Sequence, residues 1–405
     1  MQRILLHTSE PSSGAARYVS ELVYGLIANG AEVALFCPPT FEFLRDVEAR
    51  GAKLILAGHR GVGHASFVVR VARNVRYLLT TTFRQLLAMQ SGDVLHFQFP
   101  LYFPAGLVFF ALAWLRGCPI VFTAHDPKPH KWLLPTRLRW LDWNMVRLAY
   151  SISNRVIVHN ETGKQVLVRE FRQSPEKIAV VPHGPLRASQ AIGPAPLGSL
   201  RLLVFGSIRE NKGVRLAIDA VQSLNGSGAT RVGLTIAGTV ANAREQSYWA
   251  DCKASIAKNP SGIQVMEQYV PGGQVGKLIS DHHALLLPYS NFTSESGVAA
   301  LALANGRAII ATRAGGLGEL LAQCDCGIPI ETATAEGVKE AIRIALQHGP
   351  ETLQQMGEAG GALMNSGRSW VEIGEKTLAV YSAVSQDRPA LHRRLLDRIM
   401  GGISQ

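Results

Sequence analysis

The feature of this sequence that most restricts its fold is a regular alternation of short apolar runs with longer stretches of helical spacing. The first apolar run, Arg3–His7, leads through a Gly-containing loop into a stretch from Ala16 to Ile27 whose apolar residues recur three and four positions apart. Further apolar runs continue the alternation at 31–36, 93–97, 119–123, 155–158 and 177–181. Strands that alternate with helices predict a parallel sheet covered by helices on both faces.

A segment rich in Pro, Gly, Ala and Ser, from Pro185 to Ser199, interrupts this pattern. Beyond it the alternation begins again, with apolar runs at 202–205, 233–237, 263–265, 284–287 and 308–311. A length of 405 residues also suits two domains better than one. We therefore predict an α/β protein of two doubly wound, Rossmann-like domains. Because such sheets bind ligands at the carboxyl ends of their strands, we expect the two domains to face an interdomain cleft.

The sequence contains no stretch of the ~20 uncharged apolar residues that a membrane-spanning helix needs. The most apolar stretch, Pro104–Leu115, is followed by Arg116. The first residues enter a strand pattern directly, without the regions of a signal peptide, so we expect a cytoplasmic protein. Five cysteines, at positions 37, 118, 252, 324 and 326, suit a reducing compartment, and we assign them no role.

Positive charge is concentrated in the first half of the chain. Residues 1–190 hold 22 Lys and Arg against 12 Asp and Glu, a net charge of +10. Residues 191–405 hold the remaining 19 against 18, a net charge of +1. A basic face confined to one domain indicates a polyanionic partner of that domain, such as phospholipid head groups, a lipid diphosphate or nucleic acid.

The turn after the apolar run 202–205 carries two cations beside a predicted helix start. Gly206 ends the strand, Arg209 and Lys212 lie three residues apart, and a helix is predicted from about Val214. Two cations near a helix N-terminus stabilise a diphosphate through charge and through backbone N–H groups. An ordinary strand-to-helix turn with solvated charges would have the same composition.

Two further Gly-containing loops follow the next strands. The loop from Pro288 to Val298 precedes a small apolar helix, so it is either a second phosphate cradle or a plain helix start capped by Ser294 or Ser296. The loop from Arg313 to Glu319 repeats the pattern at the following strand end. Glycine-rich loops at consecutive strand ends favour a ligand site.

The order of motifs along the chain resembles the glycosyltransferase family 4 superfamily, the group 1 transferases of GT-B fold. The resemblance covers nearly the whole chain and rests on nine short motifs. They are Ser13-Gly14-Ala15, Val121-Phe122-Thr123-Ala124-His125-Asp126, Val156-Ile157-Val158-His159-Asn160, Val180-Val181-Pro182-His183-Gly184, Phe205-Gly206 to Lys212-Gly213, Ile236-Ala237-Gly238, Leu287-Pro288-Tyr289, Ser296-Gly297-Val298 and Gly315-Gly316-Leu317-Gly318-Glu319.

This resemblance implies a hexosyltransferase that uses a UDP- or GDP-sugar, without a tightly bound cofactor or a required metal. It implies an acceptor-binding domain at 1–187, a linker at 188–199, a donor-binding domain at 200–375 and, at 376–405, a C-terminal helix that returns toward the first domain. The residues expected to contact the donor are Gly206, Arg209, Lys212, Gly238, Ser296, Gly297 and Val298. Those expected near the sugar or the acceptor are Ser13, Gly14, His125 and His183.

The sequence departs from the family pattern where most members carry a Glu-x7-Glu pair. Glu295 is the nearest match to the first carboxylate, which makes it a catalytic candidate, but the second position falls in Leu301-Ala302-Leu303. The chain therefore resembles a divergent Ser-Gly-Val branch of the family. The departure leaves the stereochemistry of the transfer open.

Both stereochemical courses remain available from the residues. In a retaining transfer, Arg209, Lys212 and the loop amides would stabilise the departing diphosphate while His125 orients the sugar. In an inverting transfer a general base must take the acceptor proton, and Asp126 is the acidic residue at a suitable strand end. A turn-capping role before Pro127 is the alternative for Asp126. No cluster has the spacing of a protein metal site.

Two stretches of the first half combine Arg or Lys with apolar and aromatic residues. They are Phe67–Leu79 and Lys128–Arg147. This composition is typical of helices that lie in a lipid head-group layer, although core-facing aromatics with a solvated rim would look similar. With the +10 charge, it predicts a peripheral protein on the inner face of the cytoplasmic membrane that acts on a lipid-linked glycan. The basic run Arg388–Arg398 is predicted to continue the final helix.

Other classes of protein share part of this pattern. A nucleic-acid-binding protein would also be basic, but the sequence shows no recognition module, so we expect no nucleic-acid partner. A GT-B protein that still binds nucleotide but has lost catalysis would explain the missing second carboxylate. A phosphorylase or a sugar-nucleotide epimerase of similar fold would differ in needing free phosphate or no acceptor.

Overall fold

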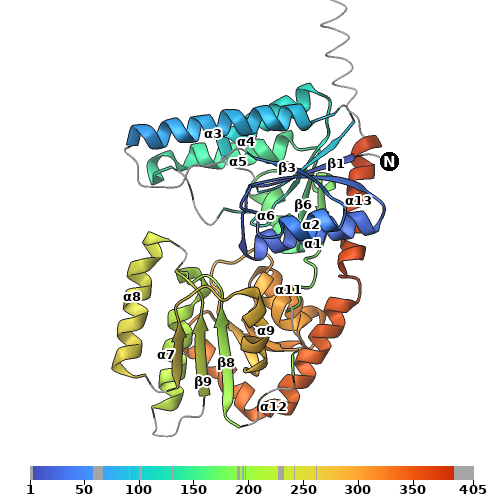
Figure 1. The fold of residues 1–405 in the computed structure, drawn as a ribbon. Coiled ribbons are helices and arrows are strands. Elements are labelled where there is room, and N and C mark those ends of the chain that lie inside the picture. The colour runs from blue at the N-terminus through green and yellow to red at the C-terminus, as the bar shows by residue number, and fades with distance from the viewer. Residues whose placement is uncertain are drawn as a thin grey trace, which may run out of the picture. The chain divides into compact units, whose positions relative to one another are not determined.

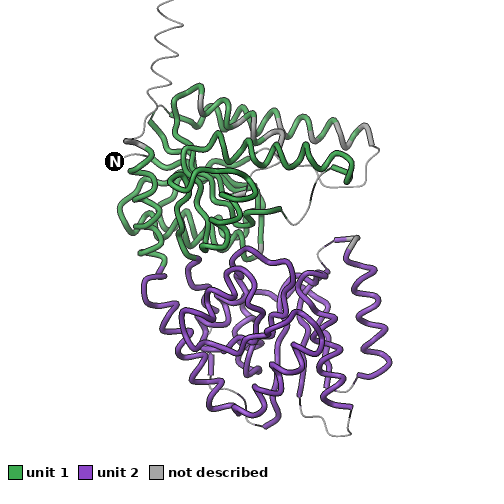
Figure 2. The backbone as a smooth tube through the Cα atoms, turned by 180° about the vertical axis from the view of Figure 1, so that it is seen from behind, with its two compact units in different colours: residues 1–182, 370–405 green, residues 183–369 purple. Residues whose placement is uncertain are grey.

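The computed structural model describes residues 3–386 apart from 58–66, 91, 100–102, 130, 131, 133, 189–191, 194, 195, 197, 227–231, 241 and 261. The chain forms two compact units, one of Met1–Pro182 with Trp370–Gln405 and one of His183–Ser369, shown in Figure 2. The boundaries expected from the sequence, at 187 and 375, lie a few residues further along the chain. The basic run Arg388–Arg398 lies outside the described residues.

The first unit is built on a parallel sheet whose strands lie in the order β3-β2-β1-β4-β5-β6-β7. This order, in which the chain reverses direction across the sheet beside β1, confirms the doubly wound fold predicted from the sequence. The strands are β1 (Arg3–Thr8), β2 (Glu32–Cys37), β3 (Lys53–Leu56), β4 (Val94–Phe99), β5 (Ile120–Thr123), β6 (Arg155–Val158) and β7 (Ile178–Val180).

Helices flank this sheet (Figure 1). They are α1 (Ser13–Ala28), α2 (Leu44–Ala49), α3 (Phe67–Ala88), α4 (Phe103–Leu115), α5 (Arg139–Ile152), α6 (Glu161–Arg169) and α13 (Trp370–Gln386), with short 3-10 turns at Thr136–Leu138 and Pro175–Lys177. Helix α13 comes from the end of the chain and packs directly on α1. At their crossing a methyl group on Gly25 would lie 1.9 Å from the carbonyl oxygen of Trp370, and one on Gly374 would lie 2.2 Å from that of Gly25. Glycine therefore permits the close approach of the two helices.

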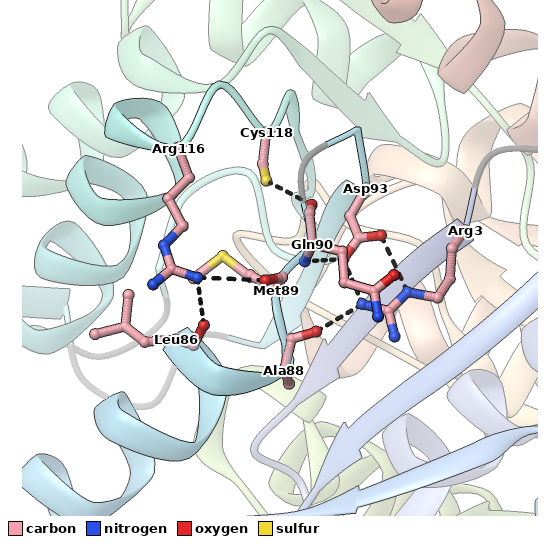
Figure 3. A network of polar contacts seen from close by, with 8 residues as sticks. All are labelled: Arg3, Leu86, Ala88, Met89, Gln90, Asp93, Arg116 and Cys118. Carbon is pink, nitrogen blue, oxygen red and sulfur yellow. Dashed lines mark hydrogen bonds and ion pairs between the residues drawn. The ribbon is translucent and has the colours of Figure 1, made fainter.

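A buried ion pair ties the end of α3 to the start of the sheet, as Figure 3 shows. The Arg3 guanidinium donates to both carboxylate oxygens of Asp93, at 3.0 and 2.6 Å, and also to the carbonyl of Ala88. Arg116 donates to the carbonyl of Leu86 at 2.6 Å. The last carbonyls of a helix have no partner within the helix, so two arginines here satisfy the C-terminal end of α3.

The second unit repeats the same topology with six strands in the order β10-β9-β8-β11-β12-β13. Its strands are β8 (Leu200–Phe205), β9 (Val232–Ala237), β10 (Ile263–Met266), β11 (Ala284–Leu287), β12 (Ala308–Thr312) and β13 (Gly327–Ile330). Its helices are α7 (Val214–Asn225), α8 (Ala243–Lys258), α9 (Gly272–Ser280), α10 (Gly297–Ala304), α11 (Gly315–Gln323) and α12 (Ala335–Asn365), with a 3-10 turn at Glu210–Lys212. All strand pairs are parallel, so the carboxyl ends of β8, β9, β11 and β12 share one edge.

Among the described residues, no helix is both long and apolar enough to cross a membrane.

Candidate active site

The loop that follows β8 meets the loops after β9 and β11 at glycines. Gly206 has a φ of +99° and Gly238 a φ of +154°, and a methyl group on Gly238 would lie 1.9 Å from the carbonyl oxygen of Gly206. Gly213 has a φ of +65°, and a methyl group there would lie 2.1 Å from the carbonyl oxygen of Pro288. A side chain at any of the three positions would be strained by the positive φ, and one at Gly213 or Gly238 would also be excluded by the neighbouring loop.

The ammonium group of Lys212 is held over this junction. A methyl group built on Gly206 would lie 3.2 Å from Lys212 Nζ and 3.6 Å from a methyl carbon of Val298. Lys212 Nζ also lies 5.5 Å from the centre of the buried Tyr289 ring. Burial, and then the nearby Arg209 cation, lower the pKa of Lys212 to about 8.

Arg209 is the second cation of this loop. Its Nε atom is buried and has no hydrogen-bond partner among the residues that the structure describes. A buried guanidinium donor without a protein partner is costly, and a bound anion would satisfy it. The two cations predicted from the sequence therefore lie together beside Gly206.

Helix α10 presents its N-terminus to the same place through Val298. Ser296 is the N-cap residue, and its hydroxyl accepts from the backbone N–H of Ala299 at 3.2 Å. This confirms the capping role considered for Ser296 in the sequence. The first N–H groups of a helix have no carbonyl partner within it, so those of Gly297 and Val298 are suited to donate to an anion. The cap and the anion site are compatible, because different N–H groups serve them.

Glu295, a predicted catalytic residue, is engaged inside the unit. Its side chain is 4% exposed and lies 3.4 Å from the Arg368 guanidinium, whose side chain is 9% exposed. Arg368 also donates to Gln323 at 2.7 Å. The carboxylate therefore has a structural partner, and its role in catalysis stays a prediction.

Polar residues gather at the carboxyl ends of β4, β5 and β6 in the first unit. His125 Nε2 lies 2.8 Å from Gln98 Oε1, and His125 Nδ1 lies 3.0 Å from His159 Nε2. His159 Nδ1 in turn lies 2.9 Å from the carbonyl oxygen of Val181. Both ring nitrogens of the predicted sugar-proximal histidine are thus held by protein groups.

The buried members of this cluster are neutral near pH 7. Burial lowers the pKa of His96 to about 3 and that of His159 to about 4. A weaker effect of Asp126 raises the pKa of His159, which places the Asp126 charge near the cluster. Asp126 is exposed, as a general base at a strand end would need to be. A carboxylate base beside a neutral histidine remains a prediction for this site.

Ser13 and Gly14 form the first turn of α1, after the carboxyl end of β1. Gly14 is exposed, and a methyl group on it would meet no atom of the described residues within 4 Å. The fold of this unit therefore does not require glycine at this position. A ligand that approaches the start of α1 would explain it.

We expect Gly14→Ala to leave stability unchanged or slightly higher and to lower turnover by about tenfold or more. Alanine gains up to about 1 kcal/mol over glycine within a helix, whereas its methyl group would occupy the space that a ligand needs. Thermal melts and steady-state kinetics measure the two effects. Gly273→Ala is the matched control, because Gly273 is also the second residue of a helix and also faces open space. Unchanged turnover in Gly14→Ala would contradict the prediction.

His183 is the first residue of the second unit, and its side chain is buried. Its Nδ1 lies 2.7 Å from the carbonyl oxygen of Gly184. Its predicted place near the sugar or acceptor therefore stays a prediction. Among the described residues, no group of three or more His, Cys, Asp or Glu is arranged to hold a metal ion.

The sequence interpretation missed His96, Gln98, Thr123 and Tyr381, which extend the cluster around His125. His96 Nε2 lies 2.7 Å from Thr123 Oγ1 and His96 Nδ1 lies 2.5 Å from Tyr381 Oη, all buried. The sequence did contain a signal for part of this cluster. His96 and Gln98 are two residues apart in a central strand, where a parallel sheet is expected to be apolar on both faces.

Two protein-family models match this chain. The first half matches Glycosyltransferase Family 4 over residues 12–184. The second half matches Glycosyl transferases group 1 over residues 187–362. The loops with Gly206, Lys212 and Ser296 fall within the second match. No curated protein sequence matches the chain.

Solved structures show the same fold along nearly the whole chain. Sucrose-phosphate synthase from Thermosynechococcus elongatus superposes with a TM-score of 0.73 at 16% identity, over 95% of this chain and 99% of that one. HepE from Anabaena superposes with a TM-score of 0.69 at 14% identity, over 94% of this chain and 100% of that one. WaaG, a glycosyltransferase involved in lipopolysaccharide biosynthesis, superposes with a TM-score of 0.64 at 17% identity, over 94% of this chain and 99% of that one. With both halves matched, this chain belongs to the glycosyltransferases of GT-B fold, with a family 4 first half and a group 1 second half.

Proposed function

We propose that this glycosyltransferase moves a hexosyl unit from a UDP- or GDP-sugar to a lipid-linked glycan in the synthesis of cell-surface or exported polysaccharide. The observation that carries the donor proposal is the placement of Lys212 beside Gly206 and the N-terminus of α10. In the same loop, the buried Nε of Arg209 has no hydrogen-bond partner among the residues that the structure describes. These groups suit a diphosphate. HepE, which shares the fold, was crystallised with UDP-glucose.

In the proposed reaction, the protein stabilises the departing nucleoside diphosphate and, in an inverting course, accepts the proton of the acceptor hydroxyl. Lys212, Arg209 and the amides of Gly297 and Val298 stabilise the negative charge that develops on the diphosphate as the glycosidic bond breaks. Asp126 is the proposed base for the acceptor hydroxyl in an inverting course. In a retaining course the diphosphate site alone provides the main stabilisation.

The experiment that tests the donor proposal is incubation with a panel of UDP- and GDP-sugars, scored by nucleotide release. Thermal melts in saturating UDP and GDP accompany it, because a ligand that binds only the native state raises the melting midpoint. We expect one nucleotide to raise the midpoint and its sugar to be consumed. Binding without consumption would indicate a protein that has lost catalysis. The absence of binding by either nucleotide would contradict the proposed donor.

We also propose that the protein binds peripherally to the inner face of the cytoplasmic membrane. This membrane proposal rests on α3, which presents apolar side chains to solvent. Four of them follow one another at helical spacing along one face of the helix. They are Val75, Leu79, Phe83 and Leu87, with exposed fractions of 48, 66, 61 and 68%. A helix of a water-soluble domain turns such a face toward the core.

The described side chains on the opposite face of α3 are buried and carry polar groups. Tyr77, Thr81 and Gln85 are at most 6% exposed. Helix α4 contacts both α3 and α5 (Figure 1), and α4 and α5 also expose large apolar side chains, among them Leu115 and Trp140, 63 and 60% exposed. Exposed arginines accompany them at 76, 84, 116, 137 and 139. An exposed apolar face edged by cations suits the head-group layer of an anionic membrane.

We expect a variant with Leu79→Ser, Phe83→Ser and Leu87→Ser to bind anionic vesicles at least about a hundredfold more weakly than the native protein. A buried Leu or Phe side chain contributes about 1.5–3 kcal/mol, and three partly inserted ones exceed the ~2.7 kcal/mol of a hundredfold change. Vesicle sedimentation at physiological salt measures the binding. Tyr24→Ser with Val265→Ser, at exposed apolar positions elsewhere, is the control. Equal binding by the native protein and the triple variant would contradict the membrane proposal.

A further inference from the structure

A continuous chain of polar contacts runs through the first unit from the end of β7 to α13. It passes from the carbonyl of Val181 through His159, His125, Gln98 and His96 to Tyr381, with heavy-atom distances of 2.9, 3.0, 2.8, 3.0 and 2.5 Å. We propose that His159 and Gln98 are positioning residues that keep a proton on His125 Nδ1 and couple protonation of His125 Nε2 to a turn of the Gln98 amide. The inference rests on the proposed function only in placing His125 at the transferase site.

The first part of the argument is the proton on His125 Nδ1. A carbonyl oxygen only accepts, so His159 must donate to Val181 from Nδ1. Because burial keeps the pKa of His159 at about 4, this ring is neutral near pH 7 and its Nε2 carries no proton. His159 Nε2 can then only accept. His125 Nδ1, 3.0 Å away, must be the donor.

The second part concerns His125 Nε2, which lies 2.8 Å from Gln98 Oε1. An amide oxygen only accepts, so in this orientation Nε2 also carries a proton and the His125 ring is a cation. With the amide turned by 180°, its N–H would donate to a bare Nε2 and the ring would be neutral. The two orientations differ by one proton, which His125 exchanges with solvent.

The hydrogen bonds of His96 with Gln98 and Tyr381 can form in both orientations of the Gln98 amide. In the first, Gln98 Nε2 donates to His96 Nε2 at 3.0 Å, and His96 donates from Nδ1 to the Tyr381 hydroxyl. In the second, His96 donates from Nε2 to the Gln98 oxygen, and the Tyr381 hydroxyl donates to His96 Nδ1. The Thr123 hydroxyl, 2.7 Å from His96 Nε2, rotates to donate or accept. In both states each ring nitrogen of His159, His125 and His96, and each end of the Gln98 amide, keeps a hydrogen-bond partner, so neither state leaves one of these groups unsatisfied.

The groups around His125 are consistent with a ring that gains a proton. Tyr18 of α1 packs edge-on against it, with ring centres 4.7 Å apart, and burial raises the pKa of Tyr18, so this phenol is neutral. His159 and His96 are neutral, and Gln98 carries no charge. Asp126, the next residue, carries the negative charge that acts on this cluster. A cation at His125 therefore has a carboxylate nearby, and the described groups named above that contact its ring are neutral.

The proposal is tested by nitrogen NMR of the full chain with ¹⁵N-labelled histidine, which reports the proton on each ring nitrogen without any need for activity. We expect His125 to keep its Nδ1 proton from pH 5.5 to 8.5 and to titrate only at Nε2. In Gln98→Glu the side chain accepts on both oxygens, so the titration midpoint of His125 should rise by about one pH unit or more. His282, buried in the other unit between the carbonyl of Leu278 and Thr235, is the internal control.

His159→Phe provides a second measurement if Gln98→Glu does not fold. Phenylalanine keeps a ring beside Tyr18 but lacks the Nε2 atom that accepts from His125 Nδ1. The neutral His125 ring should therefore change from one tautomer to a mixture of two. The pH profile of kcat/KM should move with the midpoint in Gln98→Glu. A native His125 that lacks the Nδ1 proton, or a tautomer unchanged in His159→Phe, overturns the proposal. A protein that shows the expected histidine protonation by NMR but transfers no sugar would contradict the proposed function without contradicting this inference.

Discussion

Replacing Arg209 and Lys212 together with alanine is expected to lower sugar turnover by about a thousandfold or more and to weaken nucleotide binding by a similar factor. Each hydrogen bond to a charged group contributes about 1.5–3 kcal/mol, and removing one donor aimed at developing charge costs about 10²–10³ in rate. Lys212 lies against Gly206, the buried Nε of Arg209 has no partner among the described residues, and neither cation forms an ion pair with a carboxylate of that part of the chain.

The matched control is Arg215→Ala, which removes a cation from the same stretch of chain. Arg215 is partly exposed and pairs with Asp219 at 2.8 Å on the surface of α7. Exposed pairs of this kind contribute between about 0 and 1 kcal/mol, so turnover and melting midpoint should stay near the native values. Calorimetric titration with UDP and GDP measures the affinity. A folded double variant that retained affinity and turnover would show that the diphosphate is held elsewhere.

The same lysine gives the donor site a pH dependence that serves as a second readout. The pKa of Lys212 is lowered to about 8, and a bound diphosphate favours the protonated ammonium. Below pH 8 the free protein already carries this proton, so affinity is constant. Above pH 8 the proton must be taken up on binding, and affinity falls by up to about tenfold per pH unit. Lys212→Arg should remove this decline, because arginine stays charged.

The donor loop could be predicted from the sequence because its signals are local. Gly206, the spacing of Arg209 and Lys212, and the polar run before α10 all lie next to strand ends in the chain. A parallel sheet brings the ends of its strands to one edge, so topology alone assembles these loops. The glycines at 206, 213 and 238 are required where one loop touches another, which the sequence indicates only as a preference for glycine.

The polar chain around His125 could not be predicted in the same way. His96, His159 and Tyr381 come from β4, the end of β6 and α13, and their contacts depend on rotamers and on the return of α13 to the first unit. Their residue types alone do not say which nitrogen meets which oxygen. Burial also decides their charge, since a solvated histidine and a fully buried one differ in pKa by several units.

The exposed face of α3 illustrates a similar limit. The sequence predicted a membrane-facing stretch at Phe67–Leu79 from its combination of arginines with apolar residues, whereas the exposed apolar residues extend further, to Phe83 and Leu87. An amphipathic helix has the same sequence pattern whether its apolar side faces the core or the solvent. Only the packing of α3 against its unit shows that Thr81 and Gln85 are the buried side chains.

Glu295 was predicted from the family pattern, and its surroundings lead to the second large effect that we expect. Its carboxylate is buried against Arg368, so Arg368→Met should lower the free energy of unfolding of the second unit by about 3–5 kcal/mol, because it removes the cation that pairs with a buried carboxylate. The double variant Glu295→Gln with Arg368→Met should recover most of this loss, since a neutral pair of similar volume is often as stable as a buried ion pair.

Turnover in that double variant separates a structural carboxylate from a catalytic one. The ion pair and the additional contact of Arg368 with Gln323 fix Glu295 away from solvent, so we expect turnover to recover together with stability. Urea unfolding followed by circular dichroism gives the stability, and nucleotide release gives the turnover. A double variant that melts like the native protein but stays a hundredfold or more below it in turnover would assign Glu295 to the reaction itself, as the family pattern implies.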